Sequence, residues 1–321
     1  MDRNKKTLQI FAKQDKFYKS NIGWLFPDEQ KKSGLWDSHQ EDMDEMFEED
    51  DPIMADDNLI DFAEWHLGYA QYAWAKLDDK DLQQHEFSRG IWCAYHSVKI
   101  RAEMGRIEQR INSPYSSGKL MYWWSNLILA GWVSEADEIM KLALASTNES
   151  DNHGIMSEGG YSFDTFSFFL MELYCLWKKK SFDRKDFDHP LNDGLNTPFI
   201  YDAVLPYWNT KNLEKIDQMV SLMADYHLIR TTEQDEDTTE EDEDHFEFSD
   251  SNYRLYPFEI LVWLKIRSLC GLTNPTTYSH PLMNQPLAEP ISDKPLPRPT
   301  DHKETNQLLA LVRKHYPDAR L

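Results

Sequence analysis

The sequence predicts an all-α fold, either a helical bundle or an irregular helical-repeat array of about 9 to 11 helices. Apolar residues recur at three- and four-residue intervals through most of the chain, and no segment shows the strict apolar–polar alternation of a strand. The 321 residues are 40% hydrophobic and include 11 Trp, 15 Tyr and 16 Phe, which bury large areas. We therefore expect well-packed helices joined by acidic loops, with a Pro-rich C-terminal segment.

Residues 1–57 are expected to be an N-terminal arm that contains an acidic segment, and residues 58–150 a first helical half. The spacing of apolar residues predicts four helices in this half, at about 58–77, 85–110, 120–131 and 134–143. Asn58 is a suitable N-cap for the first of them, and Gly131 a suitable end for the third. Ser134 and Asp137 can form a capping pair at the start of the fourth.

Residues 151–321 form a second helical half, or the two halves form one continuous domain. A polar, glycine-containing loop at 146–160 separates them. The helices expected here lie at about 162–179, 197–207, 213–223, 258–270 and 308–312. Six prolines between Pro281 and Pro299 predict an extended segment, because proline removes the backbone donor that a helix needs. A second acidic loop, 231–253, lies within this half.

Two segments hold the whole of the formal net charge of −22. Residues 33–75 contain thirteen Asp and Glu, residues 231–253 contain eleven, and neither segment has a Lys or Arg. Subtracting these 24 from the 56 acidic residues leaves 32 against 34 Lys and Arg, so the rest of the chain is nearly neutral. Concentrated charge repels itself within a folded chain, which favours a use outside the fold: attraction of a basic partner. The alternative is a solvated, disordered acidic loop.

The acidic runs supply the candidate partner-binding residues. Carboxylates steer and pair with Lys and Arg of a partner, and neighbouring aromatic rings supply contact area. The candidates are Asp235, Glu236, Asp237, Glu240, Glu241, Asp242, Glu243, Asp244, Phe246 and Phe248 in the second segment, and Glu48, Glu49, Asp50 and Asp51 in the first.

Catalytic and metal-binding motifs are absent from the sequence, and we predict no enzyme activity, no cofactor and no metal. His85-Glu86 resembles the start of a zinc-protease motif, but the second ligand position is Arg89. A calcium loop starting at Asp235 fails because its sixth position is Glu240 and not glycine. Cys93 and His96, three residues apart on a helix, are the one possible thiol–base pair, although Cys93 has a packed sequence environment.

Four polar residues lie within apolar helical patterns: His66, His96, Glu172 and Glu259. A buried carboxylate is costly unless it is paired, so each Glu should meet a basic side chain or a backbone donor. Arg254 and Arg267 flank Glu259 in the sequence. Structural pairing is the favoured interpretation over a catalytic carboxylate.

The chain is predicted to be cytoplasmic, with no membrane or nucleic-acid role. Its first residues carry charge but no apolar signal region, and the most apolar stretch, 166–177, is shorter than the roughly 20 residues that span a bilayer. Cys93, Cys175 and Cys270 are widely spaced, which does not suggest a disulfide framework. A sequence pI of about 4.8 opposes binding to phosphate backbones. The aromatic surplus is consistent with a homodimer, and core packing explains it equally well.

A resemblance adds to these inferences. The Pro-Phe-Glu-Ile helix start at 257–260, the turn Cys270-Gly271-Leu272 and the segment His280-Pro281-Leu282-Met283 resemble immunity proteins of bacterial polymorphic toxins, the antidotes to type VI and Rhs-type effectors. The likeness covers about residues 255–290, and elsewhere it is compositional. It implies a non-enzymatic protein that binds a cognate toxin and blocks its active site or its substrate groove. The charge of the chain adds the expectation that the acidic segments occupy or cover a basic active site. The alternative is a helical-repeat scaffold or adaptor that binds another protein without neutralising a toxin.

Overall fold

A computed structural model describes residues 34–108, 115–145, 155, 165–184, 200–231, 247–248 and 252–321, with positions 8, 9, 11–13 and 16. These residues contain helices and no β-strand, which confirms the predicted all-α fold. The chain forms two compact units. One, here the α3–α4 unit, comprises residues 22–161, 183–188 and 291–321; the other, the α8–α9 unit, comprises residues 1–21, 162–182 and 189–290.

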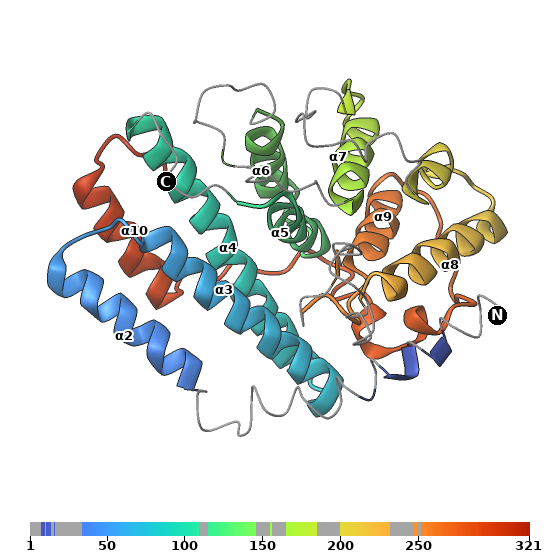
Figure 1. The fold of residues 1–321 in the computed structure, drawn as a ribbon, viewed down its shortest axis with the longest axis horizontal. Helices are drawn as coiled ribbons and strands as arrows, with labels where there is room; N and C mark the ends of the chain where they lie inside the picture. The colour runs from blue at the N-terminus through green and yellow to red at the C-terminus, as the bar shows by residue number, and fades with distance from the viewer. Residues whose placement is uncertain are drawn as a thin grey trace, which may run out of the picture. The chain divides into compact units, whose positions relative to one another are not determined.

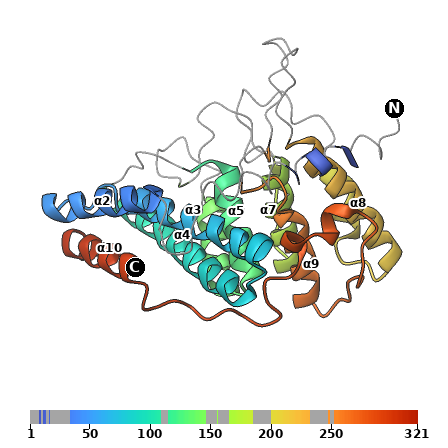
Figure 2. The same ribbon diagram turned by 90° about the horizontal axis from the view of Figure 1, so that it is seen from below.

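The α3–α4 unit is built on two long helices that lie side by side, with α2 and α10 beside them (Figures 1 and 2). Its helices are α2 (Gly34–Glu49), α3 (Ala55–Tyr72), α4 (Lys80–Glu108), α5 (Ser117–Leu129), α6 (Val133–Ala145) and α10 (Lys303–His315). A short π-helix, Ala73–Leu77, extends α3. Gly90 of α4 permits the close packing, because a Cβ there would lie 2.7 Å from Leu67 Cγ and 3.0 Å from the Ala63 carbonyl oxygen of α3.

The turn between α5 and α6 receives part of the Pro-rich segment. Gly131 adopts a φ of 79°, and a Cβ on it would lie 2.9 Å from Pro295 Cα, so both the turn and the contact require glycine. The Leu296 amide donates to the Ala130 carbonyl at 2.9 Å, and Trp132 Nε1 donates to the Leu296 carbonyl at 2.8 Å. These bonds fix the chain that leads into α10.

The α8–α9 unit contains α7 (Thr165–Lys178), α8 (Leu213–Ile229) and α9 (Phe258–Leu269). Asn212 caps α8 by accepting from the Lys215 amide at 3.1 Å, and α9 starts directly after Pro257. Where the sequence predicted a helix at 197–207, the structure has two short 3₁₀ turns, Ile200–Ala203 and Leu205–Tyr207; residues 197–199 lie outside the described part. Two further 3₁₀ turns, Pro281–Asn284 and Pro286–Ala288, begin the Pro-rich segment.

The acidic segment near the N-terminus differs from the expected arm. Residues 34–49 form the α-helix α2, because Trp36, Met43 and Met46 are buried on one side of it while the charged side faces solvent. The high density of Asp and Glu hid this short apolar stripe from the sequence prediction.

Candidate functional site

The exposed side of α2 carries a dense array of negative charge. We define the α2 acid face as the eight exposed carboxylates Asp37, Glu41, Asp42, Asp44, Glu45, Glu48, Glu49 and Asp51. None of them forms an ion pair with a described Lys, Arg or His, and no Lys or Arg occurs between residues 33 and 75. Within the described part of the chain, no cation neutralises the α2 acid face.

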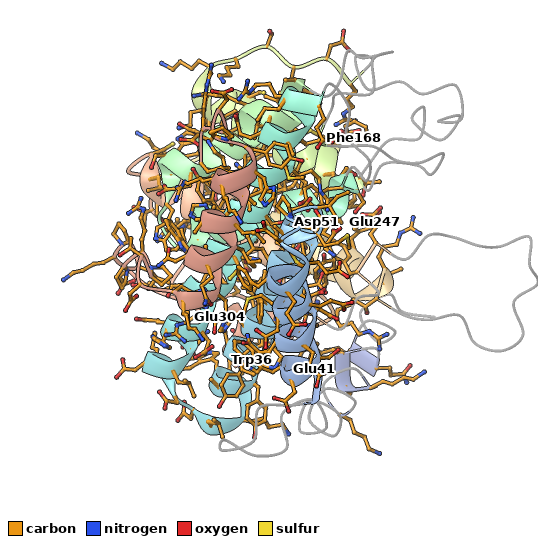
Figure 3. All side chains as sticks on the ribbon, turned by 90° about the vertical axis from the view of Figure 1, so that its left-hand side faces the viewer. Trp36, Glu41, Asp51, Phe168, Glu247 and Glu304 are labelled. Carbon is orange, nitrogen blue, oxygen red and sulfur yellow. The ribbon has the colours of Figure 1, made fainter. Side chains whose placement is uncertain are left out.

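Aromatic packing holds α2 against α3. The Trp36 ring lies 5.2 Å from the Phe62 ring and 4.5 Å from the Trp65 ring, both in edge-on geometry. Trp36 is only 4% exposed. Figure 3 shows Trp36 and Glu41 toward one end of α2 and Asp51 beyond the other. Because this core contact fixes the helix, the carboxylates are presented in a pre-organised array.

The C-terminal end of α2 is tied to α10. Asp50 adopts a φ of 54° just after the helix, and its carboxylate accepts from Lys314 Nζ at 2.5 Å and lies 3.2 Å from His315 Nε2. The hydrogen bonds to Lys314 and then to His315 lower the pKa of the Asp50 carboxyl. Asp50 therefore has cationic partners, whereas Glu48, Glu49 and Asp51 form no ion pair with a described Lys, Arg or His.

An apolar pair adjoins the acid face. Ile53 and Met54, between α2 and α3, are 53% and 48% exposed. The Asp51 carboxylate accepts from the Ile53 amide at 3.0 Å, which fixes the turn. Apolar side chains beside carboxylates provide a contact for the buried centre of an interface whose rim is charged.

The candidates of the second acidic segment fall largely outside the described residues: Asp235, Glu236, Asp237, Glu240, Glu241, Asp242, Glu243, Asp244 and Phe246. Phe248 is described, and the structure differs from the surface position expected of it. It is fully buried, and its ring stacks on Phe166 at 5.1 Å and on His227 at 4.2 Å. Phe248 is therefore a core residue of the α8–α9 unit.

Glu247, which the sequence analysis did not select, anchors the same turn to α7. Its carboxylate accepts from Thr165 Oγ1 at 2.9 Å, from the Tyr226 hydroxyl at 3.0 Å and from the Phe166 amide at 3.4 Å. Burial, and then the Glu247 charge, raise the pKa of Tyr226 to about 12, so this phenol remains a donor. Figure 3 labels Glu247 in the α8–α9 unit.

Glu259 is completely buried, as the sequence predicted, but its partner is His227 rather than an arginine. His227 Nε2 donates to the Tyr253 carbonyl at 3.0 Å, and His227 Nδ1 lies 3.0 Å from Glu259 Oε1. Since Nε2 must hold a proton for that carbonyl, a second proton lies between Nδ1 and Oε1. Arg267 instead donates to backbone carbonyls, including those of Trp208 and Thr210.

A buried chain of hydrogen bonds joins α3, α4 and α10. His66 Nδ1 lies 2.6 Å from Glu86 Oε2, and His66 Nε2 lies 3.2 Å from His302 Nε2. His302 is the N-cap of α10, where its Nδ1 accepts from the Thr305 amide at 3.4 Å. These contacts fit two neutral imidazoles, since His302 Nε2–H donates to His66 and His66 Nδ1–H donates to the carboxylate. Burial lowers the pKa of His66, in keeping with the neutral form.

Cys93 lies beside these hydrogen-bonded side chains but is not an activated nucleophile. Its Sγ is 3.4 Å from Thr305 Oγ1 and 3.7 Å from His302 Nδ1, so its histidine neighbour is His302 and not the predicted His96. Burial raises the pKa of the Cys93 thiol to about 12, which keeps it protonated near neutral pH. Sequence spacing could not indicate His302, which is 209 positions away.

The remaining polar residues that the sequence suggested are His96, Glu172 and His85, and they differ in their exposure to solvent. His96 is buried, and neither of its ring nitrogens has a hydrogen-bond partner. Glu172 is partly exposed, so its predicted burial was wrong. His85 is 54% exposed, and it does not belong to the group of three potential metal ligands found among the described residues.

None of the described helices is long and apolar enough to cross a membrane. No protein-family model matches the chain, and searches of the curated proteins and of the solved structures found no match.

Proposed function

We propose that this chain is a binding protein without enzymatic activity, and that the α2 acid face engages a basic protein partner. Its resemblance to immunity proteins suggests the more specific role of neutralising a cognate secreted toxin by covering a basic active site. The observation that supports binding is the presence of eight exposed carboxylates on and directly after one fixed helix, none of them in an ion pair with a described residue.

Electrostatics favours association through this surface more than it favours stability of the chain itself. Individual exposed ion pairs contribute only about 0.2–1 kcal/mol, but a single-sign surface raises the rate of association by about 10- to 1,000-fold at low salt. Ile53 and Met54 add exposed apolar surface that a partner could bury on binding, a contribution that charge alone does not make.

The buried thiol and carboxylates of the described residues favour a binding role over a catalytic one. Among the described residues, the histidine nearest a thiol is His302, and the pKa of that thiol, Cys93, is about 12. The buried carboxylates Glu247 and Glu259 are engaged by Tyr226, Thr165 and His227, which gives each a structural role.

A charge-neutralised variant tests the proposal. Asp44→Asn, Glu45→Gln, Glu48→Gln and Glu49→Gln remove four exposed charges from α2 without touching its buried side. The matched control removes the same four charges elsewhere, at the exposed residues Asp81, Glu289, Asp293 and Asp301. Both variants should fold, which circular dichroism and thermal unfolding would verify.

The partner to use is the product of the gene adjacent to the one that encodes this chain. Expressed alone it should arrest growth, and the parent chain should restore it. The α2 variant should associate at least tenfold more slowly in 50 mM salt and with a weaker salt dependence, whereas the control should retain the parent's rate. Equal rates for the α2 variant and the parent would refute a role for the α2 acid face. Binding without rescue of growth would replace neutralisation by the scaffold or adaptor role.

A further inference from the structure

Three potential metal ligands meet where α2 packs on α3. His39 and Asp42 are three residues apart on α2 and therefore share a side of the helix, while Asp61 lies on α3. His39 Nδ1 is 3.7 Å from Asp61 Oδ2, and one ligand atom from each of the three side chains lies within 4.8 Å of the others. In the described part of the chain, this is the one group of three or more such side chains so close together.

The distances suit a small divalent ion. A tetrahedral Zn²⁺ with ligand bonds of about 2.0–2.2 Å places its ligand atoms about 3.4 Å apart. The His39–Asp61 separation of 3.7 Å needs only a few tenths of an ångström of adjustment, whereas a separation near the 4.8 Å limit would need the Asp42 side chain to turn toward the other two. The side chains of His39 and Asp61 are 16% and 44% exposed and Asp42 is exposed, so water can complete the coordination.

The three side chains lie in a stretch of the chain without basic residues. No Lys or Arg occurs between residues 33 and 75, and Lys119 is paired with Glu64, one turn further along α3, at 2.5 Å. A bound cation would therefore offset the mutual repulsion of the Asp42 and Asp61 carboxylates.

The ligand types narrow the choice of ion. Hard ions such as Ca²⁺ and Mg²⁺ prefer oxygen alone, whereas an imidazole with two carboxylates suits Zn²⁺ and its first-row neighbours. The His39 ring also lies edge-on against Phe62, with centroids 6.0 Å apart, which restricts the direction of Nδ1.

We propose that His39, Asp42 and Asp61 bind a divalent transition-metal ion, with Zn²⁺ the best fit, and that the ion fastens α2 to α3. The bound ion stabilises the helix that presents the acid face, and this site does not depend on the identity of any protein partner. Its affinity comes from one imidazole and two carboxylates, so loss of any one of the three should weaken it.

Calorimetric titration of the full chain with ZnCl₂ tests the proposal. The exposed Cys270 is first replaced by Ser, because a free thiol binds zinc independently. We expect saturable one-to-one binding, and at least a tenfold loss of affinity in each of His39→Gln, Asp42→Asn and Asp61→Asn. The control is Asp44→Asn, which removes the same charge from the exposed side of α2 and should leave the affinity unchanged.

Titration with Co²⁺ adds a spectroscopic measurement. Coordination by His39 nitrogen with two carboxylates should give visible absorption bands that saturate at one equivalent and disappear in His39→Gln. The absence of one-to-one Zn²⁺ binding in the parent would overturn the proposal. So would a His39→Gln variant that binds as tightly as the parent, since that result indicates diffuse attraction to carboxylates rather than a ligand set. Both outcomes are independent of the partner-binding experiment.

Discussion

Replacing His96 by Leu should remove part of the acid sensitivity of this protein. His96 lies on α4, is 7% exposed and has no hydrogen-bond partner at either ring nitrogen. Its ring packs edge-on against Trp92 at 4.3 Å and Tyr95 at 5.0 Å. Burial, and then the charges of Arg313 and Lys99, lower the pKa of His96 to about 4.

The magnitude follows from proton linkage. Because the folded-state pKa lies below the ordinary value of 6.5, the unfolded chain binds the proton first as the pH falls. Stability from this residue is therefore complete above pH 6.5, falls by about 2 kcal/mol at pH 5 and by about 3 kcal/mol at pH 4, and then levels off. Leu cannot take up a proton, so its free energy of unfolding should fall about 2 kcal/mol less than that of the parent between pH 8 and pH 5.

Urea unfolding at pH 8 and pH 5, followed by circular dichroism, measures the difference. At pH 8 the variant should be within about 1 kcal/mol of the parent, since lost ring contacts offset the removal of two unpaired nitrogens. His85→Leu is the matched control, on the same helix but 54% exposed, and should change the pH dependence by less than about 0.5 kcal/mol. If His96→Leu retains the full pH dependence of the parent, the buried neutral state assigned to His96 is wrong.

Substitutions at two further residues test buried polar pairs. Arg101→Met should lower the free energy of unfolding by about 3–5 kcal/mol in urea titrations, because Asp56 is buried beside the Arg101 guanidinium and would lose its cation; a loss below about 1 kcal/mol would contradict this pairing. Glu259→Gln should change the free energy of unfolding by no more than about 1 kcal/mol at pH 7, since the amide can donate to His227 Nδ1. Glu259→Leu removes that bond and should lower the free energy of unfolding by about 1–3 kcal/mol. Equal stability of the two variants would show that the bond to His227 contributes little.

Local patterns in the sequence predicted most helices, and the misses have physical causes. The apolar periodicity of α3, α4 and α9 is long and nearly continuous, which makes such helices visible. Among the side chains of α2 that the structure describes, Trp36, Met43 and Met46 are the buried ones, so a narrow apolar stripe among many carboxylates carried the helix signal. So narrow a stripe holds the helix in place only because Trp36 packs against Phe62 and Trp65 of α3, a contact that the local sequence does not reveal.

For the candidate sites, too, the sequence predicted what depends on local composition and not what depends on the packing of distant helices. The exposed acids Glu48, Glu49 and Asp51 follow directly from composition, since charged side chains remain in water. The pairings of Asp50 with Lys314, of His66 with His302 and of Glu259 with His227 join residues 264, 236 and 32 positions apart. No local pattern specifies such contacts, because they depend on how separate helices pack.

These long-range contacts bear directly on recognition. α10 engages the rest of the α3–α4 unit at both of its ends, through His302 at its N-terminus and through Lys314 and His315 near its C-terminus. The second contact neutralises Asp50 and fixes the C-terminal end of α2, while the Trp36 packing fixes the other end. A basic partner then meets carboxylates whose helix is already ordered, and it does not have to supply the free energy of ordering it. Helix α10 thus contributes to binding through pre-organisation, because its cations pair with Asp50 and, among the described residues, none pairs with Glu48, Glu49 or Asp51.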